Sequence, residues 1–156
     1  QEFDILASQS LEELRDALWF VQDWMFDGPR RLKSACFFID GIFYVDRRHP
    51  SALDYSKELI ELLKATRPDS LRDMKSRSMG VKLCDMDRIP FGQRCIYLHQ
   101  GDLEHNVFFT GARLVGPGDC PLLEPYPILT FMRKYVKRNC YACIGKPAIW
   151  IVLDST

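Results

Sequence analysis

The stretch Cys95-Ile-Tyr-Leu-His-Gln-Gly-Asp-Leu-Glu-His105 predicts a β-hairpin that carries one histidine on each strand. Apolar residues run into and out of this stretch, and Gly101-Asp102 supply turn chemistry. Because side chains alternate across a strand, the length of the turn decides whether His99 and His105 share a face. A two-residue turn at Gly101-Asp102 puts them on opposite faces. An odd loop, Gly101–Leu103 for example, or a bulge puts them on the same face.

A second motif, Cys140-Tyr-Ala-Cys143, has the spacing with which two thiolates grip one tetrahedral metal ion. If the two motifs meet in space, His99, His105, Cys140 and Cys143 make a complete His2Cys2 set for zinc. A metal-free interpretation stays open. A strand histidine is often an ordinary hydrogen-bonded residue, and a lone Cys-x-x-Cys is incomplete as a metal motif.

Length and composition are those of an ordinary globular protein of one domain. The chain has 156 residues, enough to bury a core without help from disulfides or metal ions. It has no apolar run long enough to cross a bilayer. It begins at Gln1 without a secretory signal pattern, so we expect a piece of a longer chain. Its six cysteines could form disulfides, but a reducing compartment with one metal site fits better.

Formal net charge is zero, yet the charges are unevenly distributed. Residues 1–27 are strongly acidic, whereas residues 64–94 and 133–156 are basic. A balanced total argues against non-specific coating of nucleic acid, while local phosphate contacts remain open. The candidate DNA-binding residues are Arg133, Lys134, Lys137 and Arg138. The alternative is that these basic side chains are simply solvated. The dipole of a helix also favours positive charge at its C-terminus.

The first half of the chain predicts strand, helix, hairpin and helix. Residues 3–6 form a short strand, and the capping box Ser10-Leu-Glu-Glu13 opens a helix that runs to about Phe26. Residues 35–45 form a hairpin around Asp40-Gly41, a favoured type I′ turn pair. Ser51 then caps a second helix, which ends before Pro68.

The second half is less regular. Residues 67–94 predict a short helix or a mobile loop, residues 128–136 a helix, and residues 148–153 a strand. The fold class is α+β, with mainly antiparallel hairpins, packed helices and a C-terminal zinc-knuckle-like element. We expect one domain with a helix-hairpin-helix half (1–66), a basic loop segment (67–94) and a zinc-finger-like half (95–156).

Several stretches together resemble a known family. They are Ser8–Ala17, Lys33–Arg48, Tyr97–His105, Arg113–Val115, Tyr126-Pro127 and Arg138–Cys143. In this order they resemble the C-terminal region of the third subunit of the small nuclear RNA activating protein complex, the factor that binds the proximal sequence element. The specific part is His-Gln-Gly-Asp-x-Glu-His followed by Cys-x-x-Cys.

The resemblance implies a zinc-containing, DNA-binding module of a nuclear transcription factor. That factor acts at small nuclear RNA promoters beside a Myb-type subunit and the TATA-binding protein. By matching position, His99, His105, Cys140 and Cys143 are the candidate zinc ligands. The chain departs from the family at Leu103, where a cysteine is usual, and it ends before the family's second Cys-x-x-Cys.

Two other classes of function remain open. One is a metal-free protein-interaction domain. The other is a metallohydrolase-like enzyme, in which the cluster of His99, Asp102, Glu104 and His105 holds a metal and Glu104 serves as general base. The sequence contains no recognisable nucleophile arrangement, phosphate-binding glycine loop or nucleotide fingerprint. We therefore expect a protein that is not an enzyme.

Overall fold

The computed structural model describes residues 1–20, 23, 33–66, 74–133 and 139–146. The chain divides into two compact units. Asp4–Ile128 form the larger one, while Gln1–Phe3 and Leu129–Thr156 form the smaller one.

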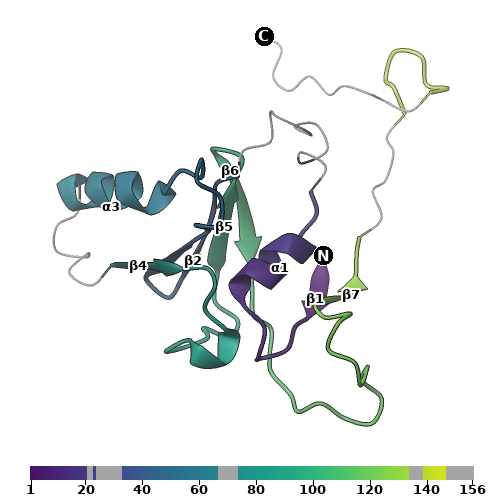
Figure 1. The fold of residues 1–156 in the computed structure, drawn as a ribbon. Helices are drawn as coiled ribbons and strands as arrows, with labels where there is room; N and C mark the ends of the chain where they lie inside the picture. Colours follow the sequence, from purple (N-terminus) through teal and green to yellow (C-terminus); the bar gives the residue numbers. More distant parts are fainter. Residues whose placement is uncertain (21–22, 24–32, 67–73, 134–138, 147–156) are drawn as a thin grey trace. The chain divides into compact units, whose positions relative to one another are not determined.

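A five-stranded sheet is the centre of the larger unit (Figure 1). Its strands are β2 (Ala35–Ile39), β3 (Ile42–Val45), β4 (Lys75–Ser78), β5 (Cys95–His99) and β6 (Leu103–Val107). Their order is β4-β3-β2-β5-β6. The pairing is antiparallel except between β3 and β4, which run parallel. The sheet is therefore mixed but mainly antiparallel, as predicted, with one parallel pair at its β4 edge.

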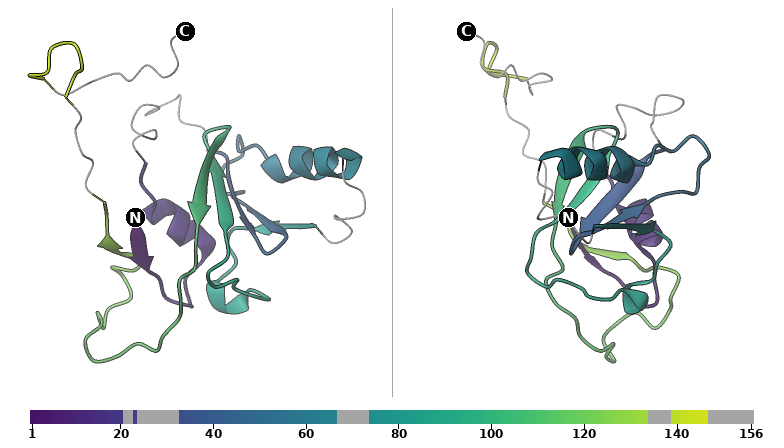
Figure 2. Two further views of the ribbon diagram at one scale, coloured as in Figure 1. Left: turned by 180° about the vertical axis from the view of Figure 1, so that it is seen from behind. Right: turned by 90° about the vertical axis from the view of Figure 1, so that its left-hand side faces the viewer.

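Helices cover both faces of this sheet (Figure 2). Helix α1 (Leu11–Ala17) covers one face and α3 (Tyr55–Thr66) the other. The core on the α1 side includes Leu11, Leu14, Ala35, Phe37, Ile39, Tyr44 and Tyr97. The core on the α3 side includes Cys36, Phe43, Val45 and Tyr55. Successive β2 side chains alternate between the two cores, so this central strand is buried on both faces.

Local chemistry places the first hairpin and the first helix where the sequence predicts them. Asp40 (φ 48°) and Gly41 (φ 81°) both have positive φ, as a type I′ turn requires. The Oγ of Ser10 accepts from the Glu13 N–H at 3.3 Å, and the Glu13 carboxylate accepts from the Ser10 N–H at 2.7 Å. The predicted capping box is therefore confirmed.

Both helices differ from the prediction at one end. Helix α1 ends at Ala17, and the three residues that follow are not helical, so the continuation toward Phe26 is wrong there. Most of residues 21–32 lie outside the described residues. Helix α3 begins at Tyr55, later than predicted, and the carboxylate of Asp54 caps it by accepting from the Ser56 N–H at 3.1 Å.

Three further segments differ from the prediction or lie outside the described residues. The basic segment expected to be a short helix or loop contributes strand β4 and a 3₁₀ turn, η3 (Leu83–Asp85). The helix predicted at residues 128–136 is wrong at its start, where strand β7 (Ile128–Phe131) pairs with β1 (Glu2–Asp4). The predicted strand at 148–153 lies outside the described residues. Among the helices that the structure describes, none is long and apolar enough to span a bilayer.

Candidate functional site

The β5–β6 hairpin brings His99 and His105 to the same face of the sheet. Its register pairs His99 with Leu103 and Tyr97 with His105. The two histidines are therefore diagonal neighbours, close enough for long or aromatic side chains to touch. The prediction that they share a face is confirmed, although they are not directly opposed.

The turn of this hairpin makes that arrangement possible in a short loop. Three residues, Gln100 to Asp102, connect the strands. Gln100 (φ 51°) and Gly101 (φ 96°) both adopt left-handed conformations. The predicted odd loop is thus correct in length but begins one residue earlier than Gly101. A two-residue turn at Gly101-Asp102 is excluded by the register.

The two imidazole rings meet through their Nε2 atoms, which lie 2.9 Å apart. On the other side of the first ring, Nδ1 of His99 lies 3.3 Å from Oδ1 of Asp23. The side chains of His99 and Asp23 are only 4% and 8% exposed. The site is therefore a row of three groups in which Asp23 and His99 are buried and His105 is half-buried.

Burial shifts the protonation of the two histidines. Desolvation is the main cause that lowers the pKa of His99, and it also lowers the pKa of His105, while the carboxylate of Asp23 acts in the opposite direction on both. Burial therefore favours the neutral form of both rings. A neutral His99 that donates from Nδ1 to Asp23 has an unprotonated Nε2, so Nε2 of His105 is the donor between the rings.

Aromatic rings enclose the pair. Phe20 stacks on His105 with ring centroids 3.7 Å apart and an interplanar angle of 15°. Tyr97 stacks on His99 at 5.1 Å. Phe20 lies just after α1, and the N–H of Asp23 donates to its carbonyl at 3.0 Å. The same part of the chain therefore supplies a contact to each histidine.

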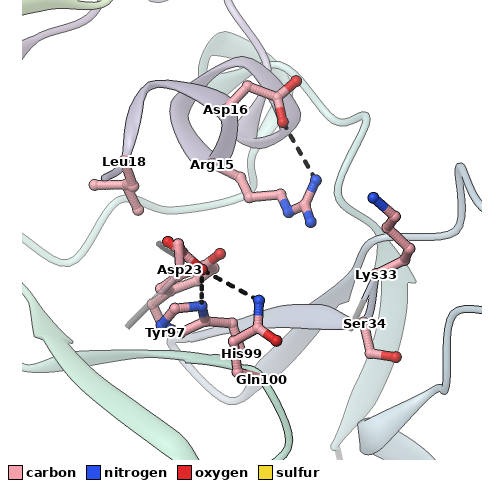
Figure 3. Close-up of a pocket in the computed structure, with 9 residues that line it drawn as sticks. All are labelled: Arg15, Asp16, Leu18, Asp23, Lys33, Ser34, Tyr97, His99 and Gln100. Atoms are coloured by element: carbon pink, nitrogen blue, oxygen red, sulfur yellow. Dashed lines mark hydrogen bonds and ion pairs between the residues drawn. The ribbon is translucent and has the colours of Figure 1, made fainter. Parts of the chain in front are cut away.

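A polar cavity of about 240 Å³ lies beside His99. Figure 3 shows Asp23 directed at both His99 and Gln100, and the Gln100 amide donates to its Oδ1 at 3.2 Å. Arg15 and Lys33 contribute positive charge to the lining. The guanidinium of Arg15 is engaged by carboxylates, so this cavity is mainly an element of the fold's polar network.

That network joins α1 to the end of β3. Asp46, 3% exposed, accepts from Arg48 Nη2 at 2.8 Å and lies 3.0 Å from Arg15 Nη1. Arg48 also contacts Asp16 at 2.6 Å and 2.9 Å, which is a bidentate geometry. Arg15 and Asp16 lie in the stretch Ser8–Ala17, and Asp46 and Arg48 lie in Lys33–Arg48. Both stretches carry the family resemblance, and this is the signal in the sequence that points to the four residues.

The second candidate half-site lies in the smaller unit. Residues 140–146 fold into a tight turn in which the Ile144 N–H donates to the Cys140 carbonyl at 2.8 Å. Ile144 has a φ of 58°, which is rare for a β-branched residue. The backbone N–H groups of Cys143 and Ala142, followed by the Cys143 thiol, lower the pKa of Cys140. Such donors stabilise a thiolate, the form that binds metal.

The other cysteines differ from this pair. None of the six is in a disulfide, and all lie within the described residues. Burial raises the pKa of Cys36 to about 12 and also raises that of Cys95. Buried thiols of this kind are inert. Cys140 is therefore the cysteine whose surroundings favour a ligand.

The described residues contain no group of three or more His, Cys, Asp or Glu side chains arranged to hold a metal ion, so the predicted zinc-knuckle-like element is not shown. His99 and His105 form one pair in the larger unit, and Cys140 and Cys143 form another in the smaller unit. Glu104, the general base of the enzyme hypothesis, alternates with His105 along β6 and so lies on the opposite face of the sheet. Glu104 therefore does not face the histidine pair and cannot act on a metal held there.

The candidate DNA-binding residues are mostly beyond the structural description. Arg133 is exposed and follows β7. Lys134, Lys137 and Arg138 lie outside the described residues. Sequence reasoning missed Asp23 entirely, because nothing in its neighbourhood of the sequence links it to a histidine in a distant hairpin.

The comparison with known proteins agrees with the resemblance seen in the sequence. Residues 1–156, the whole chain, match the family described as snRNA-activating protein complex (SNAPc), subunit 3. The proteins named snRNA-activating protein complex subunit 3 from Mus musculus and Rattus norvegicus are 33% and 32% identical over 97% of this chain. The one from Bos taurus is 32% identical over 94%. The chain spans about 40% of the length of these relatives. Because the family match covers every residue, this chain belongs to the family of subunit 3 of the snRNA-activating protein complex.

Proposed function

We propose that this chain is a zinc-stabilised module of a transcription factor that binds small nuclear RNA promoters at the proximal sequence element. It acts in the nucleus as a protein-interaction and DNA-binding part of the complex. The observation that carries the zinc proposal is the convergence of two neutral histidines through their Nε2 atoms, 2.9 Å apart, on one face of a hairpin. Family membership supports the role in the complex.

The candidate ligands fit zinc as two pairs, the two histidines and the two cysteines. In a tetrahedral site with Zn–N bonds of about 2.0–2.1 Å, two nitrogen ligands lie roughly 3.3 Å apart, close to the observed separation of the histidines. Hydrogen bonds from backbone N–H groups favour the thiolate of Cys140, and Cys143 follows at the spacing of a metal knuckle. When bound, zinc would supply folding free energy.

We assign a structural role to this zinc. Two histidines and two cysteines close a four-coordinate shell, which leaves no position for a substrate. Leu103, at the position where a cysteine is usual in the family, lies opposite His99 in the ladder and brings no additional ligand. The enzyme alternative is further weakened because Glu104 lies on the opposite face of the hairpin.

Exposed apolar side chains support a role in protein interaction. Several lie in residues 108–123 of the larger unit, where Leu114 is 93% exposed and Leu123 is 70% exposed. Apolar surface of this kind marks contact sites with other proteins. The expected partners are the other subunits of the complex, including a Myb-type subunit, and the TATA-binding protein.

Direct DNA contact is assigned to Arg133, Lys134, Lys137 and Arg138. These basic residues follow strand β7 in the sequence, in a basic part of a chain whose net charge is zero. They can supply contacts to phosphates, which position a protein on DNA but do not read bases. We therefore expect them to act together with the partner subunits.

Measuring zinc in the purified chain tests the zinc proposal. We expect about one zinc per chain, and loss of both zinc and thermal stability in Cys140→Ser and Cys143→Ser, because a structural metal contributes folding free energy. Cys84→Ser is the matched control, since Cys84 is an exposed thiol in η3. A zinc-free chain whose melting temperature is unchanged by chelator would instead establish the metal-free interaction domain.

A further inference from the structure

We propose that an apolar groove on the larger unit is a docking site for another subunit of the complex. Its occupant is a short apolar segment of that subunit, with a basic side chain beside the apolar ones. This inference rests on the proposed role in protein interaction and deepens it, because it names the surface and the chemistry of the partner.

The groove has a volume of about 190 Å³ and is lined mainly by apolar side chains. These are Ile5, Leu83, Ile89, Phe91, Phe109 and Val115. Four of them belong to the core on the α1 side or pack against it, whereas Phe91 and Val115 are 48% and 63% exposed. The groove therefore has a floor that continues the core and an apolar rim that is open to solvent.

Hydrogen bonds between backbone groups hold the walls of the groove together. The N–H of Gly92 donates to the carbonyl of Phe109 at 2.8 Å, which connects the segment after η3 to the segment after β6. The N–H of Cys84 donates to the carbonyl of Ala7 at 2.8 Å, which connects η3 to the beginning of the chain. Because these walls are already fixed, a partner that docks between them need not order this part of the protein.

The size of the groove favours side chains of a protein over a small molecule. Sites for small molecules and cofactors have volumes of about 300 Å³ or more. The groove is smaller than that, and its apolar lining offers burial to apolar side chains.

The charge of the groove indicates what flanks those apolar side chains. Its charged lining residues are Asp4, Arg113 and Asp119. The guanidinium of Arg113 donates to both oxygens of Asp119, at 2.6 Å and 2.7 Å, so these two charges balance. Asp4, 50% exposed, lies 3.3 Å from the same guanidinium and is the surplus acid. A surplus acid at the rim favours a basic side chain on the partner and disfavours a phosphate.

Two glycine-to-tryptophan variants test the groove. Gly111 lines it, and a Cβ added there would meet no heavy atom within 4 Å. Gly118 has the same open space around an added Cβ but does not line the groove. Gly111→Trp should therefore fill the groove without disturbing the fold, and Gly118→Trp is its matched control.

Binding of the complete protein to each of the other subunits, prepared recombinantly, is the readout in biolayer interferometry. Gly111→Trp should weaken binding to one subunit by at least about tenfold, because it removes the pocket for a central apolar side chain. Gly118→Trp should bind within about twofold of the unmodified protein. Asp4→Asn should lower the association rate with the same subunit and make that rate less sensitive to salt. Equal affinity of the two tryptophan variants would overturn the proposal.

Photo-crosslinking identifies the occupant without filling the groove. With p-benzoylphenylalanine in place of Val115, the assembled complex should yield a crosslink to an apolar segment of another subunit that contains Lys or Arg. The same analogue in place of Leu62, which is 59% exposed on α3, is the control and should not reach that segment. A crosslink from position 115 to this chain itself, to a second copy of it, or to a segment without a basic residue would overturn the proposal.

The two proposals fail in different ways. If the complete protein binds none of the other subunits, the proposed role in protein interaction fails and this inference fails with it. If it binds them, but Gly111→Trp has no effect and position 115 does not crosslink to another subunit, only the assignment of the groove is wrong.

Discussion

Replacing Asp46 by Asn should destabilise the fold strongly without altering any candidate ligand. The Asp46 carboxylate is 3% exposed and lies at the end of β3, where it contacts Arg48 at 2.8 Å and Arg15 at 3.0 Å. Because Arg15 belongs to α1, this carboxylate connects the helix to the sheet through an ion pair. An asparagine side chain keeps the size of the acid but carries no charge, so the variant removes the ionic contacts and little else.

The loss in free energy of unfolding depends on how well Arg15 and Arg48 are solvated or paired once the Asp46 carboxylate is gone. Breaking a buried ion pair by removing one partner costs about 3–5 kcal/mol. Here Arg15 and Arg48 are 18% and 38% exposed, and Arg48 keeps its contact with Asp16 at 2.6 Å. Water and Asp16 therefore compensate in part, and we expect a loss of about 2–3 kcal/mol in the free energy of unfolding at pH 7.

The same contact predicts a pH dependence. Burial alone would raise the pKa of Asp46, but hydrogen bonds from Arg48 and the charges of Arg15 and Arg48 outweigh it, so the pKa lies below its ordinary value of 3.8. A lowered pKa contributes stability that is present above the ordinary value and is lost as the pH falls through the folded-state pKa. The advantage of the unmodified chain over Asp46→Asn should therefore shrink below about pH 4.

Urea unfolding of both chains, in the same buffers and at the same zinc concentration, measures this difference. Asp16→Asn is the control, because Asp16 is 54% exposed and its pairing should contribute less than about 1 kcal/mol. If Asp46→Asn costs no more than this control at pH 7, the tie between α1 and the sheet does not stabilise the fold as argued.

Three further outcomes are expected. Ser10→Ala removes the acceptor for the Glu13 N–H and should cost about 1 kcal/mol, measured by thermal unfolding; an unchanged midpoint would show that the cap adds nothing. Ile144→Gly should stabilise the turn at residues 140–146 by about 1 kcal/mol, because it relieves a left-handed conformation at an exposed residue, and thermal unfolding would reveal it. Charge reversal at Lys134 and Lys137 should weaken promoter binding by the assembled complex and lower the slope of log affinity against log salt by about 0.9 for each phosphate that is no longer neutralised. Tight, sequence-specific binding by this chain alone at physiological salt would contradict that assignment.

The parts of the fold that sequence reasoning located are those decided by local chemistry. The Asp40-Gly41 turn requires positive φ at both positions, and the capping box at Ser10 satisfies backbone groups within four residues. The shared face of His99 and His105 also follows from a local quantity, the parity of a short turn. Each of these depends on neighbours in the sequence.

The errors arise where distant contacts decide the outcome. Strand β4 has the sequence Lys-Ser-Arg-Ser, without an apolar alternation, and it is a strand because its backbone pairs with β3. The four residues of β7, Ile-Leu-Thr-Phe, are mostly apolar but too few to distinguish strand from helix, and pairing with β1 settles the choice. Asp23 belongs to the histidine site through a contact that no local pattern encodes.

The pairing of β1 with β7 has a consequence for synthesis on the ribosome. Glu2–Asp4 and Ile128–Phe131 lie near opposite ends of the chain that the structure describes, yet they form one two-stranded sheet. At about 5–20 residues per second, the second strand follows the first by roughly 6 to 25 s. During that interval β1 leaves the ribosome without its partner, so its backbone groups stay hydrated or are held by a chaperone until translation has passed residue 131.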